Sequence, residues 1–531
     1  MSKLLKDLLA FVFLTTSLCV TVHAESVIGR PVGADTLEFW VMDNGLGSQK
    51  SIHKIVKKFQ RETGTPVKVR VLNWGEAFVE ISRALSDTSG SAPDLLQLGS
   101  TWVPHFAATG KIRVLDSMLA QMDSSRFYPQ TYVAGHIADR PGIYAFPWFL
   151  DVRALFVNEW LWHSLGILES DIEDFPKFMG ALREINRGGL KNTEMKPVAA
   201  FSLPGKDDWT GPQMMAPFVW NQGGDFIVKN GQRYRSGLLD TATLKGVATY
   251  AKILGDTELA PFALQDNSER SAARFVHSEQ LLHYSTSELI RQLEYPASAG
   301  GLRSTAIADD GIMIVPFPAG PQGRSTFVGG SHLTLPSNAD SLKFEKAESL
   351  LAYLLRVDNL DAFCRSVGFP PSDRGLMRIW MQDRRYSQLI NDLEHGRSFP
   401  NIPEWGAIEN LLIGLSNNMG NMFSVDADPV ARAREMAGLL LETDRQIDSV
   451  LGNAPRVDAG ALRPWIEGVL SGKIEEVTPE NLSFEPQEPP FPVWRVVLVV
   501  GCILVVAIFA LLVWLLVKFI RNRRSGGRSV R

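Results

Sequence analysis

The sequence predicts an α/β protein built on a parallel sheet, because strand-like and helix-like segments alternate from residue 36 onward. Residues 36–42 (TLEFWVM), 67–71 (VKVRV) and 94–99 (DLLQLG) are short runs of β-favouring residues. Between them, residues 48–64 and 77–85 place apolar side chains at helical spacing. A βαβαβ order of this kind indicates parallel strands covered by helices.

The helix expected over residues 48–64 has the clearest local signals. Its apolar positions follow the i, i+3, i+4, i+7 pattern at Ile52, Ile55, Val56 and Phe59. Ser48 is the expected N-cap, and Gly64 is the expected end. Further strands are predicted within 142–158, 196–203 and 311–321, and further helices within 207–224, 346–357 and 431–451.

Side chains suited to ligand contact follow the three predicted strands of the parallel sheet. Ligands of such sheets bind beyond the carboxyl ends of the strands. The residues at these ends are Asp43, Asn44, Asn73, Trp74, Ser100, Thr101 and Trp102. A single tryptophan more often packs in a core, but the clustering at strand ends favours a binding site.

Both ends of the chain predict a protein exported to a membrane. Residues 1–24 have the positive start, apolar run and small-residue cleavage site of a signal peptide, alternatively an uncleaved anchor. Residues 494–518 contain 22 successive residues without a charge, which span roughly 33 Å as a helix. The basic tail 519–531 predicts a cytoplasmic C-terminus, with one pass through the inner membrane and the large domain in the periplasm. The acidic, proline-rich segment 473–493 is expected to be a semi-rigid linker.

Composition and missing motifs argue against several functions. The net charge of −4 indicates no nucleic-acid partner. Only Cys364 lies between the predicted signal and span, so no disulfide is expected there. Nucleotide-binding, serine-hydrolase and zinc-protease motifs are absent from the sequence, and the nine histidines are scattered, so we predict no cofactor, metal site or catalytic residue. The acidic pair Asp207–Asp208 is interpreted as solvated loop charge.

Several further segments resemble one protein family. PWFLDVRALFVNEWLWHSLGI, FQRETGTPVKV, APDLLQLGSTWVPHFAATGKIRVLD, FVGGSHLTLP and NIPEW occur in the order and approximate spacing of the family 1 extracellular solute-binding proteins. These are the maltose-binding-protein-like receptors of ABC sugar importers. The resemblance covers about residues 36–465. The predicted membrane span departs from the pattern of this family, since typical members are free in the periplasm or lipid-anchored.

The resemblance implies a two-lobed periplasmic binding protein fold of type II with a hinge and a central cleft. Lobe one would hold about 36–147 and 332–373, and lobe two about 148–331 and 374–472 within the domain 25–472. Ligand-binding residues would be Asp43, Asn44, Trp74, Ser100, Thr101, Trp102, Asp151, Trp209, Thr286, Ser287, Gly330, Ser331 and Trp405.

The functional prediction is a receptor that delivers a solute to ABC permease subunits. Tryptophan faces with a few carboxylates and amides suit a sugar or polyol. Because Arg153 and Arg324 lie near predicted site positions, a phosphate-bearing ligand is an alternative to a sugar or polyol. The alternatives are a sensing subunit that signals to a membrane sensor kinase, and a glycosidase using Asp43 and Asp151. We predict that the protein is not an enzyme.

Overall fold

The computed structural model describes residues 36–87, 92–120, 122–425, 428–454 and 459–471. These residues form two compact units, unit 1 (to Asp151, then Gly329–Ile379) and unit 2 (Val152–Val328, then from Trp380). The predicted lobe boundaries differ from these divisions by a few residues each. The predicted signal peptide, linker, membrane span and basic tail lie outside the described residues. Within the described part of the chain, no helix has the length and apolar character needed to cross a membrane.

Unit 1 is built on the predicted parallel strands, and this prediction is confirmed. Strand β1 (Leu37–Met42) pairs in parallel with β2 (Val67–Leu72) on one side and with β3 (Leu95–Gly99) on the other. The returning strand β10 (Thr326–Thr334) pairs antiparallel with β3 through Ser331–Thr334. The carboxyl ends of β1, β2 and β3 therefore lie along one edge of the sheet.

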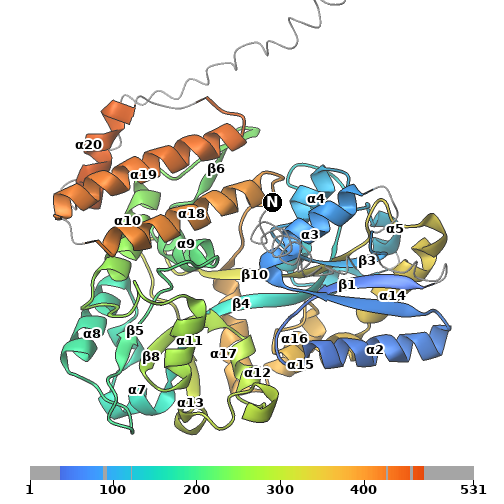
Figure 1. The fold of residues 1–531 in the computed structure, drawn as a ribbon, viewed down its shortest axis with the longest axis horizontal. Coiled ribbons are helices and arrows are strands. Elements are labelled where there is room, and N and C mark those ends of the chain that lie inside the picture. Colours follow the sequence, from blue (N-terminus) through green and yellow to red (C-terminus); the bar gives the residue numbers. More distant parts are fainter. Residues whose placement is uncertain (1–35, 88–91, 121, 426–427, 455–458, 472–531) are drawn as a thin grey trace, which may run out of the picture. The chain divides into compact units, whose positions relative to one another are not determined.

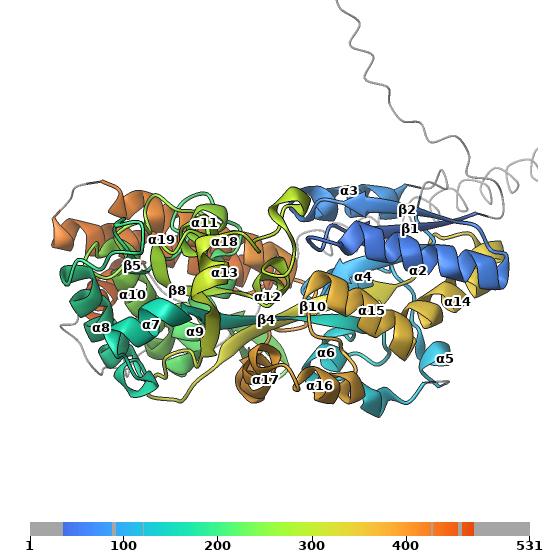
Figure 2. The same cartoon turned by 90° about the horizontal axis from the view of Figure 1, so that it is seen from below.

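Helices cover the sheet of unit 1 and supply most of its apolar core. They are α2 (Ser48–Thr63), α3 (Trp74–Ser86), α4 (Val103–Ala108), α5 (Asp116–Leu119), α6 (Pro129–Ala134), α14 (Phe344–Leu354), α15 (Val357–Val367) and α16 (Arg374–Trp380). Figure 2 shows α2, α14 and α15 side by side. The four predicted apolar positions of α2 are all buried, and Gly64 ends the helix in a left-handed conformation with φ 73°.

The predicted N-cap of α2 is wrong. Ser48 is the first helical residue, and the cap is Gly47, which offers no side-chain oxygen. The Ser48 hydroxyl is drawn away from the helix end, because it accepts a hydrogen bond from the Asn44 backbone N–H at 3.3 Å.

Unit 2 contains a mixed sheet of parallel and antiparallel strands, and helices alternate with these strands along the chain. Strand β4 (Phe146–Asn158) passes from unit 1 into unit 2, where it pairs antiparallel with β8 (Gln280–Thr286) and β9 (Ile312–Val315). Strand β5 (Ala199–Phe201) pairs in parallel with β8, and β11 (Gly396–Arg397) with the start of β10. The helices are α7 (Glu159–Leu165), α8 (Phe175–Arg187), α9 (Gly211–Asn221), α10 (Thr241–Gly255), α11 (Ser268–Val276), α12 (Glu288–Gln292), α13 (Ala306–Asp310), α17 (Arg384–Asn391), α18 (Trp405–Phe423), α19 (Pro429–Val450) and α20 (Ala459–Leu470).

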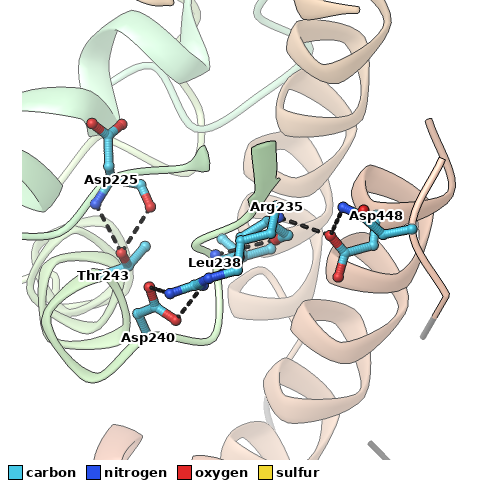
Figure 3. A network of polar contacts seen from close by, with 8 residues as sticks. Asp225, Arg235, Leu238, Asp240, Thr243 and Asp448 are labelled. Atoms are coloured by element: carbon cyan, nitrogen blue, oxygen red, sulfur yellow. Dashed lines mark hydrogen bonds and ion pairs between the residues drawn. The ribbon is translucent and has the colours of Figure 1, made fainter. Parts of the chain in front are cut away.

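A hairpin of β6 (Ile227–Asn230) and β7 (Arg233–Ser236) is tied to the helices of unit 2 by polar contacts (Figure 3). Arg235 forms a two-fold ion pair with Asp240, with both N···O distances at 2.9 Å. The Ser236 backbone N–H donates to the carboxylate of Asp448 on α19 at 2.8 Å. Asp448 is 1% exposed, so its hydrogen bonds join the hairpin firmly to α19. Helices α9, α10, α18 and α19 pack together around this region (Figure 1).

Candidate functional site

The strand ends of unit 1 bring one exposed carboxylate beside a helix that starts with tryptophan. Asp43 follows β1 and is exposed, with its carboxylate accepting only from the Gly45 N–H at 3.2 Å among the hydrogen bonds found. Asn73 follows β2 and serves as the N-cap of α3, since its oxygen accepts from the Gly75 N–H at 2.9 Å. The cap fixes the first turn of α3 and thereby the position of Trp74.

Trp74 and Trp102 form a half-buried aromatic surface at this edge of the sheet. Their ring centroids lie 5.5 Å apart at an interplanar angle of 60°. Phe78 packs edge-on against Trp102 at 5.5 Å. Gly99 lies beneath the two rings, where an added Cβ would be 3.4 Å from Trp74 and 3.8 Å from Trp102. The two tryptophans are therefore held in place from below while part of each ring stays accessible.

Ser100 and Thr101 connect β3 to this aromatic surface. The Ser100 backbone N–H donates to the Gly330 carbonyl at 2.9 Å, which joins the end of β3 to β10. Ser100 is buried and Thr101 is half-buried. At Gly330 an added Cβ would come within 2.5 Å of the Phe149 carbonyl oxygen, so glycine is needed there for the close approach of two strands. Asp151, at the end of unit 1 within β4, is partly buried.

Asn44 and Ser331 lie in the interior of unit 1, at 3% and 1% exposure. The Asn44 amide nitrogen donates to Gln97 Oε1 at 3.1 Å, and Gln97 Nε2 donates back to Asn44 Oδ1 at 3.0 Å. Gln97 Nε2 also donates to the Ser331 hydroxyl at 2.7 Å. The hydrogen-bonding groups of these two predicted site residues are thus engaged within unit 1. Gln97 was not among the predicted site residues, although a glutamine inside the apolar run LLQLG is a signal of a buried polar contact.

Trp209 of unit 2 lies on a loop whose neighbours are tightly fixed. The Trp209 side chain is 58% exposed, whereas Asp208 is 5% exposed. The Asp208 carboxylate accepts from the backbone and hydroxyl of Thr210 at 2.7 and 2.5 Å, and from those of Ser268 at 2.6 and 2.5 Å. The Asp208 N–H donates to Asn417 Oδ1 at 3.0 Å. Interpreting Asp208 as solvated loop charge is therefore wrong, because this carboxylate anchors the loop that presents Trp209.

Thr286 and Ser287 lie at the end of β8. Thr286 is partly buried and is paired with Arg153 across the β4–β8 ladder. Ser287 is fully buried, and its hydroxyl has no hydrogen-bond partner within the described residues. Arg153 is 5% exposed, while Arg324 lies 3.6 Å from the carboxylate of Asp392. Burial raises the pKa of Asp392, and Arg324 opposes that shift.

Trp405 is fully buried at the start of α18. Its ring stacks on Phe399 with centroids 4.4 Å apart and an angle of 28°. The indole N–H has no hydrogen-bond acceptor within the described residues. In this structure both the ring and its N–H are enclosed by unit 2, so Trp405 offers no open surface comparable to that of Trp209.

The two units therefore present aromatic surface and hydrogen-bonding groups without a recognisable reaction centre. In unit 1 these are Asp43, Trp74, Ser100, Thr101 and Trp102 at one sheet edge; in unit 2 they are Trp209, Thr286 and Ser287. No group of three or more metal-ligating side chains occurs within the described residues. Aromatic surface with a few hydrogen-bonding groups is typical of small-molecule binding sites.

The sequence matches the bacterial extracellular solute-binding proteins over residues 44–359, which is more than half of the chain. The chain belongs to this family, whose members are binding proteins and not enzymes. This membership confirms the predicted family and the prediction that the protein is not an enzyme. It also places the binding domain outside the cytoplasm.

Particular relatives agree with this assignment. The chain is 25% identical over 387 residues to the diacetylchitobiose binding protein DasA of Streptomyces coelicolor, which covers 72% of this chain and 85% of DasA. The fold is similar to that of the GacH receptor of Streptomyces glaucescens, solved unliganded and with acarbose, at a TM-score of 0.64, 18% identity and coverage of 79% of this chain and 99% of GacH. An ABC-transporter solute-binding protein of Thermotoga lettingae bound with α-D-tagatose gives a TM-score of 0.64, 16% identity and coverage of 79% and 100%. These similarities confirm the predicted two-lobed α/β fold.

Proposed function

We propose that this protein is an extracytoplasmic receptor for a carbohydrate, which it delivers to the permease subunits of an ABC importer. The observation that carries the proposal is the Trp74–Trp102 surface beside the exposed Asp43 carboxylate. Sugar rings present flat C–H faces to aromatic planes and hydroxyls to carboxylates. The similar proteins named above bind diacetylchitobiose, acarbose and tagatose, all of which are carbohydrates.

The ligand contacts that we propose fall into two groups by their accessibility. Trp74, Trp102, Trp209, Asp43 and Thr286 reach the surface of their own unit and are the direct contacts. Asn44 and Ser331 are engaged in internal hydrogen bonds and support the end of β3. Thr101, Asp151 and Gly330 are partly buried and join the direct contacts, whereas the buried Ser100, Ser287 and Trp405 join the supporting residues.

Binding of sugars to the purified domain 25–472 tests this function. The probes are N,N′-diacetylchitobiose, maltose, tagatose and the polyol ribitol, each measured by calorimetry and thermal shift. A ligand at free concentration L stabilises the folded state by RT ln(1 + L/Kd), so Tm rises with the logarithm of the ligand concentration above Kd. We expect saturable binding of at least one sugar without turnover. Release of hydrolysed sugar, or no binding of any of the four, would contradict the proposal.

We further propose that residues 494–518 anchor the receptor in the inner membrane, with 473–493 as a linker and 519–531 in the cytoplasm. Tethering raises the concentration of the receptor at its membrane partner by an amount set by the reach of the linker. About twenty residues at roughly 3.1 Å each allow a reach of up to ~60 Å. A reporter active only in the periplasm should work when fused after Gly472 and fail when fused after Arg531. The reverse pattern would refute this topology.

Replacement of the proposed membrane span tests whether the span only tethers the receptor or itself contacts a partner protein. An unrelated apolar span in place of 496–517 should preserve sugar uptake if the span serves only as a tether. If output is lost while expression and sugar binding stay normal, the span itself contacts a partner helix. That result would favour the alternative function, in which the closed receptor signals to a membrane sensor kinase.

A further inference from the structure

Arg153 in β4 is a buried cation without an anionic partner in unit 2. Its side chain is 5% exposed. One terminal nitrogen, Nη1, lies 3.9 Å from the Met214 sulfur, and the guanidinium carbon lies 6.0 Å from the ring centroid of Phe327. The Nε–H group has no hydrogen-bond acceptor among the residues that the structure describes. Across the ranges that the structure describes, no carboxylate forms an ion pair with Arg153.

Two less buried arginines of unit 2 are each paired with a carboxylate. Arg274 lies 2.9 Å from the fully buried carboxylate of Asp266, and Arg235 forms its two-fold pair with Asp240. A guanidinium remains charged at all physiological pH values, and burying a charge without a partner is costly. Weak contacts with a thioether and an aromatic face offset only a small part of that cost. The fold therefore holds at Arg153 a charged donor whose Nε–H is unsatisfied within the described residues and whose Nη1 donates only to a weak sulfur acceptor.

The positive charge of Arg153 affects the pKa of a nearby buried histidine. His283, in the neighbouring strand β8, is 4% exposed, and its pKa is lowered to about 3 by burial and, second, by repulsion from Arg153. Both effects disfavour the charged imidazolium, so His283 stays neutral beside the guanidinium and offers it no negative charge.

The backbone around Arg153 is fixed and lies beside two proposed ligand contacts. The Thr326 hydroxyl donates to the Arg153 carbonyl at 2.5 Å, and Tyr284 hydrogen-bonds to Thr326 at 2.9 Å. Arg153 and Thr286 are direct partners in an antiparallel ladder, so their side chains lie on the same face of the sheet. The residue after Thr286 is Ser287, whose buried hydroxyl has no hydrogen-bond partner in the part of the chain that the structure describes. Arg153 Nε in the sheet and the Ser287 hydroxyl directly after β8 are therefore both unsatisfied within the described residues.

We propose that Arg153 donates hydrogen bonds to an oxygen acceptor of the bound sugar, either the carboxylate of an acidic sugar or the carbonyl of an acetamido group. The receptor would then prefer such sugars over those whose only polar groups are hydroxyls. This inference rests on the proposed carbohydrate function. The planar fork of donors in a guanidinium matches carboxylate oxygens in two-fold contact and strengthens a single carbonyl contact by its charge.

The first test needs no ligand. In the purified full-length chain, Arg153→Met replaces an unpaired buried cation with an apolar side chain of similar length, and should raise Tm by about 2–4 °C. Arg274→Met is the matched control, because it leaves the buried Asp266 carboxylate without its partner and should lower Tm. If Arg153→Met lowers Tm as much as the control does, Arg153 is a structural residue and the inference is overturned.

The second test measures Kd for N,N′-diacetylchitobiose, digalacturonate and maltose by calorimetry, in the wild type, Arg153→Met and Arg153→Gln. We expect the wild type to prefer the acetamido or the acidic sugar, and both variants to weaken that sugar by about tenfold or more. Maltose affinity should change less than twofold. If the acidic sugar loses affinity in the variants, the site recognises a carboxylate. If the acetamido sugar loses affinity, the site recognises its carbonyl.

The outcomes separate this inference from the proposed function. A wild type that prefers maltose, with variants that bind all three sugars as tightly as it does, overturns the role of Arg153 and leaves the carbohydrate function in place. A wild type that binds tagatose or ribitol but none of the three overturns the role of Arg153 and leaves the carbohydrate function in place. A wild type that binds none of these ligands overturns both. Arg274→Met should leave every sugar affinity of the folded protein unchanged.

Discussion

The side chains of Asn44 and Gln97 exchange two hydrogen bonds, of 3.1 and 3.0 Å, in the interior of unit 1. Gln97 Oε1 also accepts from the Met42 backbone N–H at 2.9 Å, and its Nε2 donates to Ser331 at 2.7 Å. A single glutamine on β3 therefore links the end of β1 to β10. These links hold the strand ends from which Asp43 and Trp102 extend.

Removal of this glutamine should destabilise the protein. Gln97→Leu removes the donor to Asn44 Oδ1 and the acceptor of the Met42 N–H, while Asn44 Nδ2 keeps its bond to the Met42 carbonyl at 3.0 Å. Each buried group left unsatisfied costs about 1–3 kcal/mol. Urea unfolding of the exported domain should show this loss. Gln49→Leu, at an exposed position of α2, is the control and should change the free energy of unfolding by less than about 0.5 kcal/mol. Equal midpoints for the two variants would disprove the role of Gln97.

The aromatic surface of unit 1 should dominate sugar affinity. Trp102→Ala removes a half-buried ring that packs against Trp74 and Phe78, and should weaken binding of the preferred sugar by about 1–4 kcal/mol. Trp160→Ala is the control, since this 45% exposed tryptophan of α7 is not a proposed contact. Circular dichroism must show that both variants are folded. Unchanged affinity in folded Trp102→Ala would remove this surface from the site.

Asp208 should affect sugar affinity only through the position of its neighbour Trp209. Asp208→Asn places an amide where Thr210 and Ser268 both donate, so the anchor of the loop is weakened. Sugar affinity should fall by roughly 1 kcal/mol. In a Trp209→Ala background the same substitution should have almost no further effect, because the anchor then positions nothing that touches the ligand. Calorimetry on the four proteins measures this. Additive losses would show that Asp208 acts by another route.

The α/β class and the strand ends were predictable because they depend on local periodicity. Residues 36–99 alternate between strand and helix patterns, and parallel strands bring their carboxyl ends to one edge. The burial of Asp208 was not predictable, since its partners Ser268 and Asn417 lie 60 and 209 positions away in sequence. Ser48 looked like a helix cap locally, but a hydrogen bond from Asn44 redirects its hydroxyl.

The exposure of individual tryptophans could not be predicted from local sequence patterns either. Trp209 and Trp405 both follow short polar segments, yet one is 58% exposed and the other fully buried. The difference arises from packing: Trp405 stacks on Phe399, whereas no ring contact is found for Trp209 within the described residues. Sequence reasoning selected both as ligand contacts on equal terms, and the structure distinguishes them by exposure.

Buried histidine makes the stability of unit 1 depend on pH. His332 on β10 is fully buried, and its Nε2 lies 2.9 Å from the Thr131 carbonyl. Burial lowers the pKa of His332 to about 4; the Thr131 carbonyl opposes this shift, and His136 adds to it. The unfolded chain has an ordinary value of about 6.5 for this group. The folded state therefore binds the proton less tightly than the unfolded state does.

This difference predicts acid destabilisation between pH 6.5 and 4. The contribution of neutral His332 is fully present above pH 6.5 and is lost progressively as pH falls toward 4, by about 3 kcal/mol in total. The measurement is the free energy of unfolding from pH 7.5 to 4 for the exported domain and its His332→Asn variant. Because His283 and the carboxylates titrate in both proteins, the difference between the two pH profiles isolates His332. The variant should lose about 3 kcal/mol less than the wild type over this range, and parallel profiles would show that His332 is not the group responsible.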